Sequence, residues 1–250
     1  MIETGGTAGK GDACWEPPLV SRHGRRCRVG REGEPVPRTV VPDLPTDDSQ
    51  FPTGLASSSI AGRMSDRVRV WCLRHAEAED VATVTAGAIP NTPLTVRGRG
   101  QALDAAQRLA AESITWIYSS TALRARQTAE LLAATSGLRI TAKPGLVEVG
   151  CTADVLRAWV VEQDLGRRAA DGETGQQVVA RVTAALQTIA GAHPGGTVAV
   201  VGHVASLTVA LGRLCSLGSG VWGTPLPHAR PFLVAWDGRA WRCPTWPAVG

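Results

Sequence analysis

The sequence of 250 residues lacks the long apolar segments that mark membrane proteins. No apolar run reaches the roughly 18 residues that a transmembrane helix needs. The N-terminus lacks the apolar region of a secretory signal, and nothing apolar follows Arg25-Arg26, which resembles the start of a twin-arginine signal. We therefore expect a cytoplasmic protein with no membrane partner.

Paired metal ligands and a strong charge imbalance are missing as well. The six cysteines include no Cys-x-x-Cys pair, and Cys72 and Cys215 lie in apolar runs, as reduced core residues do. The net charge of +4 would suit an anionic small molecule but is too small to predict a nucleic-acid partner. The five histidines are dispersed, without the spacing of metal ligands, so we expect neither a metal nor a cofactor. They stand at positions 23, 75, 193, 203 and 228.

Residues 1–66 differ in composition from the rest of the chain. They are rich in Gly, Pro, Ser and Arg and show no sustained period of 2 or 3.6 residues, so they cannot bury enough apolar area to offset backbone ordering. We interpret 1–66 as a disordered extension and 67–250 as one domain. Met64 is the only internal methionine, so either translation starts near it or the first 63 residues are dispensable.

Strand and helix patterns alternate from residue 67 onward. Val68, Val70 and Cys72 alternate with polar or larger residues, which predicts a strand, and Thr95 is a typical residue to begin a helix. This alternation predicts a mostly parallel sheet covered by helices on both faces. We expect strands at 67–73, 114–120, 138–144 and 197–203, helices from Thr95 to Ala111 and at 122–135, 153–164, 173–192 and 204–217, and a hairpin at 231–243.

Polar residues follow three of the predicted strands. Ligands of such sheets gather outside the carboxyl ends of the strands. Arg74-His75, Ser119-Ser120 and Gly202-His203 should therefore share one edge, and Arg124 should join them from the first turn of its helix.

These residue types suit a phosphate monoester. Arginine side chains match phosphate oxygens in bidentate fashion, and a neutral imidazole is a competent nucleophile near pH 7. One histidine would attack phosphorus while the other binds the transferring group, and a carboxylic acid would protonate the leaving oxygen. Glu148 is the best candidate for that acid, with Glu77 and Glu79 as competitors.

For four further polar residues, the sequence leaves two alternative roles open. Ser119 and Ser120 could donate to phosphate, but we favour capping of the following helix. His228 and Arg230 either line the substrate side or have no role.

Five segments, in order, resemble motifs of the histidine phosphatase superfamily, also called phosphoglycerate-mutase-like. LRHAEAE resembles its RHG motif, and the resemblance extends from about residue 67 to 246. Ala76 and Val204 replace two expected glycines, Val81 stands near an expected asparagine, and the usual W-E-G stretch is absent. The other four segments are NTPLTVRGRGQA, SSTALRARQTAE, DGETGQQVVARV and HPGGTVAVVGH.

The resemblance implies a three-layer α/β/α sandwich with a mostly parallel central sheet and phosphoryl transfer through a phosphohistidine. Carried over by position, His75 is the nucleophile, Arg74, Arg124 and His203 bind the phosphoryl group, and Glu148 is the proton donor.

The favoured hypothesis is a metal-independent phosphatase that acts on a small phosphorylated metabolite, as a monomer or homodimer. A phosphoglycerate-type mutase and a phosphohistidine protein phosphatase are alternatives, and the RHAEA variant favours the latter. A phosphate-binding pseudophosphatase is the alternative outside the enzymes.

Overall fold

The computed structural model describes residues 67–79, 91–223 and 225–247. The predictions for residues 1–66 and for Val81 lie outside these ranges. The described strands are β1 (Val68–Arg74), β2 (Trp116–Ser119), β3 (Ile140–Ala142), β4 (Thr197–Gly202), β5 (Phe232–Trp236) and β6 (Trp241–Arg242). The described α-helices are α1 (Val96–Leu109), α2 (Leu123–Ala134), α3 (Ala153–Val160), α4 (Gly175–Ala192) and α5 (Val204–Leu214).

The described strands form one sheet in the order β3-β2-β4-β1-β5-β6. The first four are parallel to one another, whereas β5 is antiparallel to β1 and pairs with β6 as the expected hairpin. The predicted mostly parallel sheet is therefore confirmed. Because parallel neighbours end at the same edge, this order places the carboxyl ends of β1, β2 and β4 side by side.

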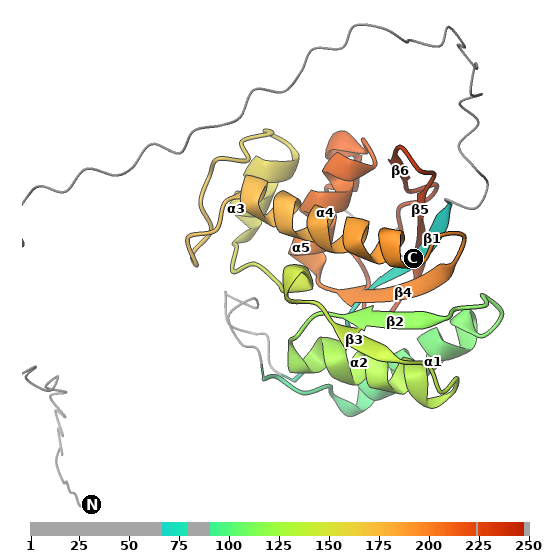
Figure 1. Ribbon diagram of the computed structural model, residues 1–250. Helices are drawn as coiled ribbons and strands as arrows, with labels where there is room; N and C mark the ends of the chain where they lie inside the picture. The colour runs from blue at the N-terminus through green and yellow to red at the C-terminus, as the bar shows by residue number, and fades with distance from the viewer. Residues whose placement is uncertain (1–66, 80–90, 224, 248–250) are drawn as a thin grey trace, which may run out of the picture. The chain divides into compact units, whose positions relative to one another are not determined.

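Helices cover both faces of the sheet, as predicted (Figure 1). Helices α1 and α2 pack on one face, and α3, α4 and α5 pack on the other. Successive residues of a strand point to opposite faces, so β1 and β4 supply both cores. Val70, Cys72, Val198 and Val200 join the core under α4 and α5, and Leu73, Ala199 and Val201 join the core under α1 and α2.

Three predicted elements extend too far. The strand expected at 138–144 covers only Ile140–Ala142, and Pro144, which has no backbone N–H, begins a short 3₁₀ helix instead. The helices expected at 153–164 and 204–217 end at Val160 and Leu214. Gln163 and Ser216, just beyond these ends, have φ of 58° and 55°, a left-handed conformation that cannot continue a right-handed helix.

Candidate active site

The two predicted strand-end histidines meet at the carboxyl edge of the sheet. Strands β1 and β4 pair with Arg74 opposite Gly202, and the backbone N–H of His75 donates to the Gly202 carbonyl at 2.9 Å. Since His75 and His203 are the next residues of their strands, their rings lie together, with centroids 5.1 Å apart. The shared edge that the sequence predicts is confirmed.

Arg124 lies between the two histidines. It occupies the first turn of α2, which begins just after β2, and only 3% of it is exposed. Its Nε donates to His75 Nε2 at 3.2 Å, and its Nη2 donates to His203 Nδ1 at 3.3 Å. A buried guanidinium thus lies beside both imidazoles, where it would meet an anion that reaches either ring.

The hydrogen bonds of His75 define its tautomer. Its Nδ1 lies 2.7 Å from the Ala76 carbonyl, which only accepts hydrogen bonds, so Nδ1 carries the proton. The neutral ring therefore has its lone pair on Nε2, the nitrogen that accepts from Arg124. A nucleophilic histidine needs this unprotonated nitrogen toward its substrate.

Both histidines are held neutral. Burial is the main reason that the pKa of His75 lies well below its ordinary value, and the charges of Arg124 and Arg74 lower it further, against the hydrogen bond to the Ala76 carbonyl. Burial likewise lowers the pKa of His203, followed by the effects of His75 and Arg124. Near pH 7 the fixed positive charge of the site therefore comes from its arginines.

Arg74 adds a second guanidinium to this edge. Its Nη1 donates to the Leu226 carbonyl at 3.2 Å, while its buried Nε has no acceptor among the described residues. A buried N–H without an acceptor costs free energy, and a phosphoryl oxygen would remove that cost. Burial lowers the pKa of Arg74, and the Glu148 carboxylate opposes the shift, which indicates that Glu148 lies near this group.

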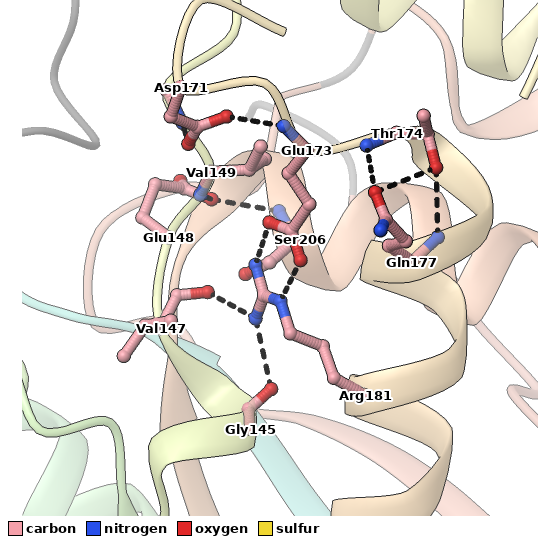
Figure 2. Close-up of polar contacts among 11 residues, drawn as sticks. Gly145, Val147, Glu148, Val149, Asp171, Glu173, Thr174, Gln177, Arg181 and Ser206 are labelled. Atoms are coloured by element: carbon pink, nitrogen blue, oxygen red, sulfur yellow. Dashed lines mark hydrogen bonds and ion pairs between the residues drawn. The ribbon is translucent and has the colours of Figure 1, made fainter. Parts of the chain in front are cut away.

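Glu148 reaches the site from the segment between β3 and α3. Its carboxylate accepts the backbone N–H of Ala205 at 3.0 Å and that of Ser206 at 2.9 Å, both in the first turn of α5, and Figure 2 shows the contact with Ser206. Burial lowers the pKa of Arg124, and the negative charge of Glu148 partly opposes that shift, so Glu148 acts on this arginine as well. All five predicted site residues therefore lie around the carboxyl edge of the sheet.

The two competing carboxylates lie elsewhere. Glu77 accepts the Thr95 hydroxyl at 3.0 Å and pairs with Arg97 at 3.3 Å, so it is engaged with the start of α1. Glu79 is exposed. Among the three candidates, Glu148 is the one held beside the arginines.

Sequence reasoning assigned the wrong role to Ser120. Helix α2 begins at the N-cap Ala122 and has no side-chain cap, so neither Ser119 nor Ser120 caps an N–H within the helix. The Ser120 hydroxyl accepts the backbone N–H of Ala122 at 3.3 Å, just before the helix, and it also accepts His203 Nε2–H at 2.7 Å, because the two strand ends bring this serine against the imidazole. The Ser119 hydroxyl is buried without a partner among the described residues.

Thr128 supports the site and was missed in the sequence. Its hydroxyl accepts the Ala76 N–H at 3.0 Å and donates to the Arg124 carbonyl at 2.7 Å, so it joins the nucleophile's loop to α2. Its position four residues after Arg124, on the same face of the helix, was the available signal.

His228 lies on the other side of the nucleophile. Its Nδ1 donates to the His75 carbonyl at 2.9 Å, and the two rings are 5.4 Å apart. Burial is the main cause of its lowered pKa. Arg230 is exposed. Of the pair proposed for the substrate side, His228 is the one in contact with the site.

The described part of the chain contains no group of three or more His, Cys, Asp or Glu residues arranged to hold a metal ion. Within the same residues, no helix combines the length and the apolar character that crossing a membrane requires.

Comparisons with known proteins show the family and support the fold of this chain. The model of the histidine phosphatase superfamily (branch 1) matches residues 70–248. The probable phosphoglycerate mutase GpmB of Photorhabdus laumondii is 31% identical over 163 residues, which are 60% of this chain and 76% of that protein. Bacillus stearothermophilus YhfR has a similar structure, with a TM-score of 0.62 and 24% identity over 73% of this chain and 98% of that one. For a mycobacterial glucosyl-3-phosphoglycerate phosphatase the TM-score is 0.60, with 24% identity over 73% and 100%.

Proposed function

Because this chain belongs to branch 1 of the histidine phosphatase superfamily, we propose that it is a metal-independent phosphatase of a small phosphomonoester. The observation that carries this proposal is the state of His75. Its Nδ1 proton is bound by the Ala76 carbonyl at 2.7 Å, and burial lowers its pKa, so Nε2 is an unprotonated nitrogen beside Arg124. That is the state required for attack on phosphorus.

In the first step, His75 Nε2 forms a bond to phosphorus while the bond from phosphorus to the ester oxygen breaks. The N–H groups of Arg74 and Arg124 that face the site bind the phosphoryl oxygens, with His203 beside them, and hold their negative charge. For this step Glu148 must hold a proton, which it donates to the departing oxygen, and that oxygen leaves as an alcohol. The products are a phosphohistidine and a Glu148 carboxylate.

In the second step, water attacks the phosphohistidine. The Glu148 carboxylate takes a proton from that water as the oxygen bonds to phosphorus, and the bond from phosphorus to Nε2 breaks. Inorganic phosphate is released, and both His75 and Glu148 return to their starting protonation states.

A phosphoglycerate-type mutase is the second candidate, supported by the name of the 31% identical relative. A mutase must keep water from its phosphohistidine so that the group returns to an acceptor hydroxyl. We favour hydrolysis, because the segment between residues 145 and 172 contains only one short α-helix, Ala153–Val160, with which to cover the site.

The test is an assay of phosphate release from p-nitrophenyl phosphate and from a panel of phosphorylated metabolites. We expect turnover that excess EDTA leaves unchanged, and a base-stable, acid-labile phosphate on His75 after rapid quenching. A phosphate trapped on serine or cysteine, or activity that EDTA removes and a divalent ion restores, would contradict the mechanism. Isomerisation of a phosphoglycerate without phosphate release would identify a mutase, and binding without turnover a pseudophosphatase.

A further inference from the structure

An arginine on α4 is bound on two sides by groups outside its own helix. Arg181 donates from Nε to Glu173 at 2.6 Å and from Nη2 to the same carboxylate at 3.0 Å (Figure 2). Its Nη1 donates to the carbonyls of Gly145 at 3.0 Å and Val147 at 2.7 Å. The planar guanidinium thus joins a carboxylate on one side to two backbone carbonyls on the other.

The two carbonyls belong to the segment that carries Glu148. Val147 directly precedes Glu148, and Gly145 lies so close to α4 that a Cβ atom there would stand 2.9 Å from the Arg181 carbonyl oxygen. This close approach shows that the segment is pressed against the helix. Side-chain bonds from Arg181, rather than sheet pairing, hold the backbone just before the glutamate.

A second carboxylate holds the backbone just after Glu148. Asp171 accepts the Gly150 N–H at 2.7 Å and the Glu173 N–H at 3.1 Å. The Asp171–Glu173 segment therefore holds both sides of Glu148, through Asp171 directly and through Glu173 by way of Arg181. Arg181 also acts on the site at longer range, since its charge contributes, after burial and nearer groups, to the lowered pKa of His203.

We propose that Arg181 and Glu173 are a positioning pair that holds Glu148 where it can protonate the leaving oxygen. This inference rests on the proposed function, in which Glu148 is the proton donor. Arg181 contacts the glutamate's backbone segment and neither His75 nor the arginines of the site in any described hydrogen bond. Its effect on turnover should therefore pass mainly through proton donation, with only a small effect on phosphoryl binding through its charge on His203.

The alternative is a contact that only stabilises the fold. The side chains of Arg181 and Glu173 are only 20% and 24% exposed and their pair is bidentate, so it contributes to stability as well, and a loss of activity by itself does not separate the two roles. A stabilising role would lower the activity toward every substrate alike, through loss of folded protein. A positioning role would lower it selectively, where the leaving group needs a proton.

The experiment compares Arg181→Met with Glu148→Gln on two substrates. The p-nitrophenolate of p-nitrophenyl phosphate leaves without a proton, whereas glycerol 2-phosphate needs one. For Arg181→Met we expect kcat/KM toward glycerol 2-phosphate to fall roughly 10- to 100-fold, a share of what a general acid typically contributes, and to fall much less toward p-nitrophenyl phosphate. In the Glu148→Gln background, adding Arg181→Met should lower kcat/KM toward glycerol 2-phosphate by less than about a further twofold, because both changes act through the same proton donor.

Two variants serve as controls. Thr174→Ala removes the capping box at the start of α4, in which Thr174 and Gln177 exchange hydrogen bonds, and leaves the bonds of Arg181 in place (Figure 2). It should lower the melting temperature without changing the ratio of the two kcat/KM values. Arg181→Lys keeps the charge but cannot reach Glu173 and both carbonyls together, so its ratio should fall between wild type and Arg181→Met.

Equal losses on both substrates, or fully additive losses with Glu148→Gln, would overturn the positioning role while the phosphatase proposal stands. A wild-type protein that releases phosphate from neither substrate would refute the phosphatase proposal itself. If circular dichroism shows Arg181→Met to be unfolded, the same comparison of substrates with Arg181→Lys decides the question.

Discussion

The nucleophile and the proposed proton donor reach one site by different structural routes. His75 continues β1, whose backbone is paired with β4 in register, and its own N–H donates to the Gly202 carbonyl at 2.9 Å. Glu148 lies on a segment between β3 and α3 that side chains of α4 and the preceding loop hold in place. The position of His75 therefore depends on the sheet, and that of Glu148 on polar contacts and on the buried neighbours Leu146 and Val149.

This difference predicts how each group tolerates change elsewhere. Moving His75 requires disruption of paired strands at the centre of the domain, which would unfold the domain. Moving Glu148 requires the loss of a few hydrogen bonds and a shift of the buried neighbours Leu146 and Val149, but no disruption of paired strands. Variants far from the site should therefore affect proton donation more readily than nucleophilic attack.

The largest effect is expected for His75→Ala. The substitution removes the nitrogen that attacks phosphorus, so kcat/KM should fall by roughly 10⁴-fold or more on substrates with good and poor leaving groups alike. Steady-state phosphate release and phosphate labelling measure the loss. Substantial turnover with an acid-labile phosphate on another residue would show that the strand end does not supply the nucleophile.

A smaller but still large effect is expected for Arg124→Lys. A lysine offers a point charge in place of the fork that contacts both His75 and His203. We expect kcat/KM to fall about 10- to 100-fold on both substrates, the size of one or more charged hydrogen bonds. Arg126→Lys, an exposed position on the same helix, is the matched control and should retain full activity.

The sequence predicted the strand-end half of the site well, and for a physical reason. Residues that follow parallel strands share an edge whatever the rest of the fold does, so His75, His203 and Arg124 could be brought together from strand patterns alone. The partners of Glu148 could not, because Ala205 and Ser206 lie 57 and 58 residues away and have no pattern of their own. Its place after the third predicted strand favoured that glutamate, and the resemblance to a family implied the same residue.

The errors in the prediction have local causes. Ser120 resembles a capping residue in the sequence, but its hydroxyl binds the N–H just before α2 and His203 Nε2–H rather than an N–H within the helix. Helices α3 and α5 end early because Gln163 and Ser216 adopt left-handed backbone conformations. The sequence does not indicate this conformation, because neither residue is a glycine. Competition from tertiary contacts thus explains the misassigned side chain, and backbone geometry explains the misplaced ends.

The free energy of unfolding should fall in acid because His75 is buried in its neutral form. The folded-state pKa of His75 lies well below its ordinary value, mainly through burial, so the unfolded chain binds its proton first. Stability is then present above about pH 6.5 and is lost as pH falls below it, with a slope of up to about 1.4 kcal/mol per pH unit for one such histidine.

Urea denaturation at pH values between 7 and 5 measures this slope. His75→Ala should lose less stability over that range than wild type, because one proton fewer binds on unfolding. The pKa of His203 is also lowered, mainly by burial, so in the variant His203 still contributes to the loss of stability in acid. Identical slopes for wild type and His75→Ala would show that the folded and unfolded states bind this proton equally, so that the pKa of His75 is not lowered.

The smallest effect is expected for deletion of residues 1–63. Both routes into the site, through β1 and through α4, begin after residue 67, and the sequence before residue 67 has no apolar period from which to build a core. Activity should therefore be unchanged, and the melting temperature should shift by less than about 2 °C, which for a domain of this size is under about 1 kcal/mol.

Deletion through residue 72 is the contrasting control, since it removes most of β1 and should prevent folding. A selective loss of activity toward glycerol 2-phosphate in the 1–63 deletion would mean that the extension acts on the Glu148 side of the site, whereas a drop of several degrees would mean that it packs on the domain.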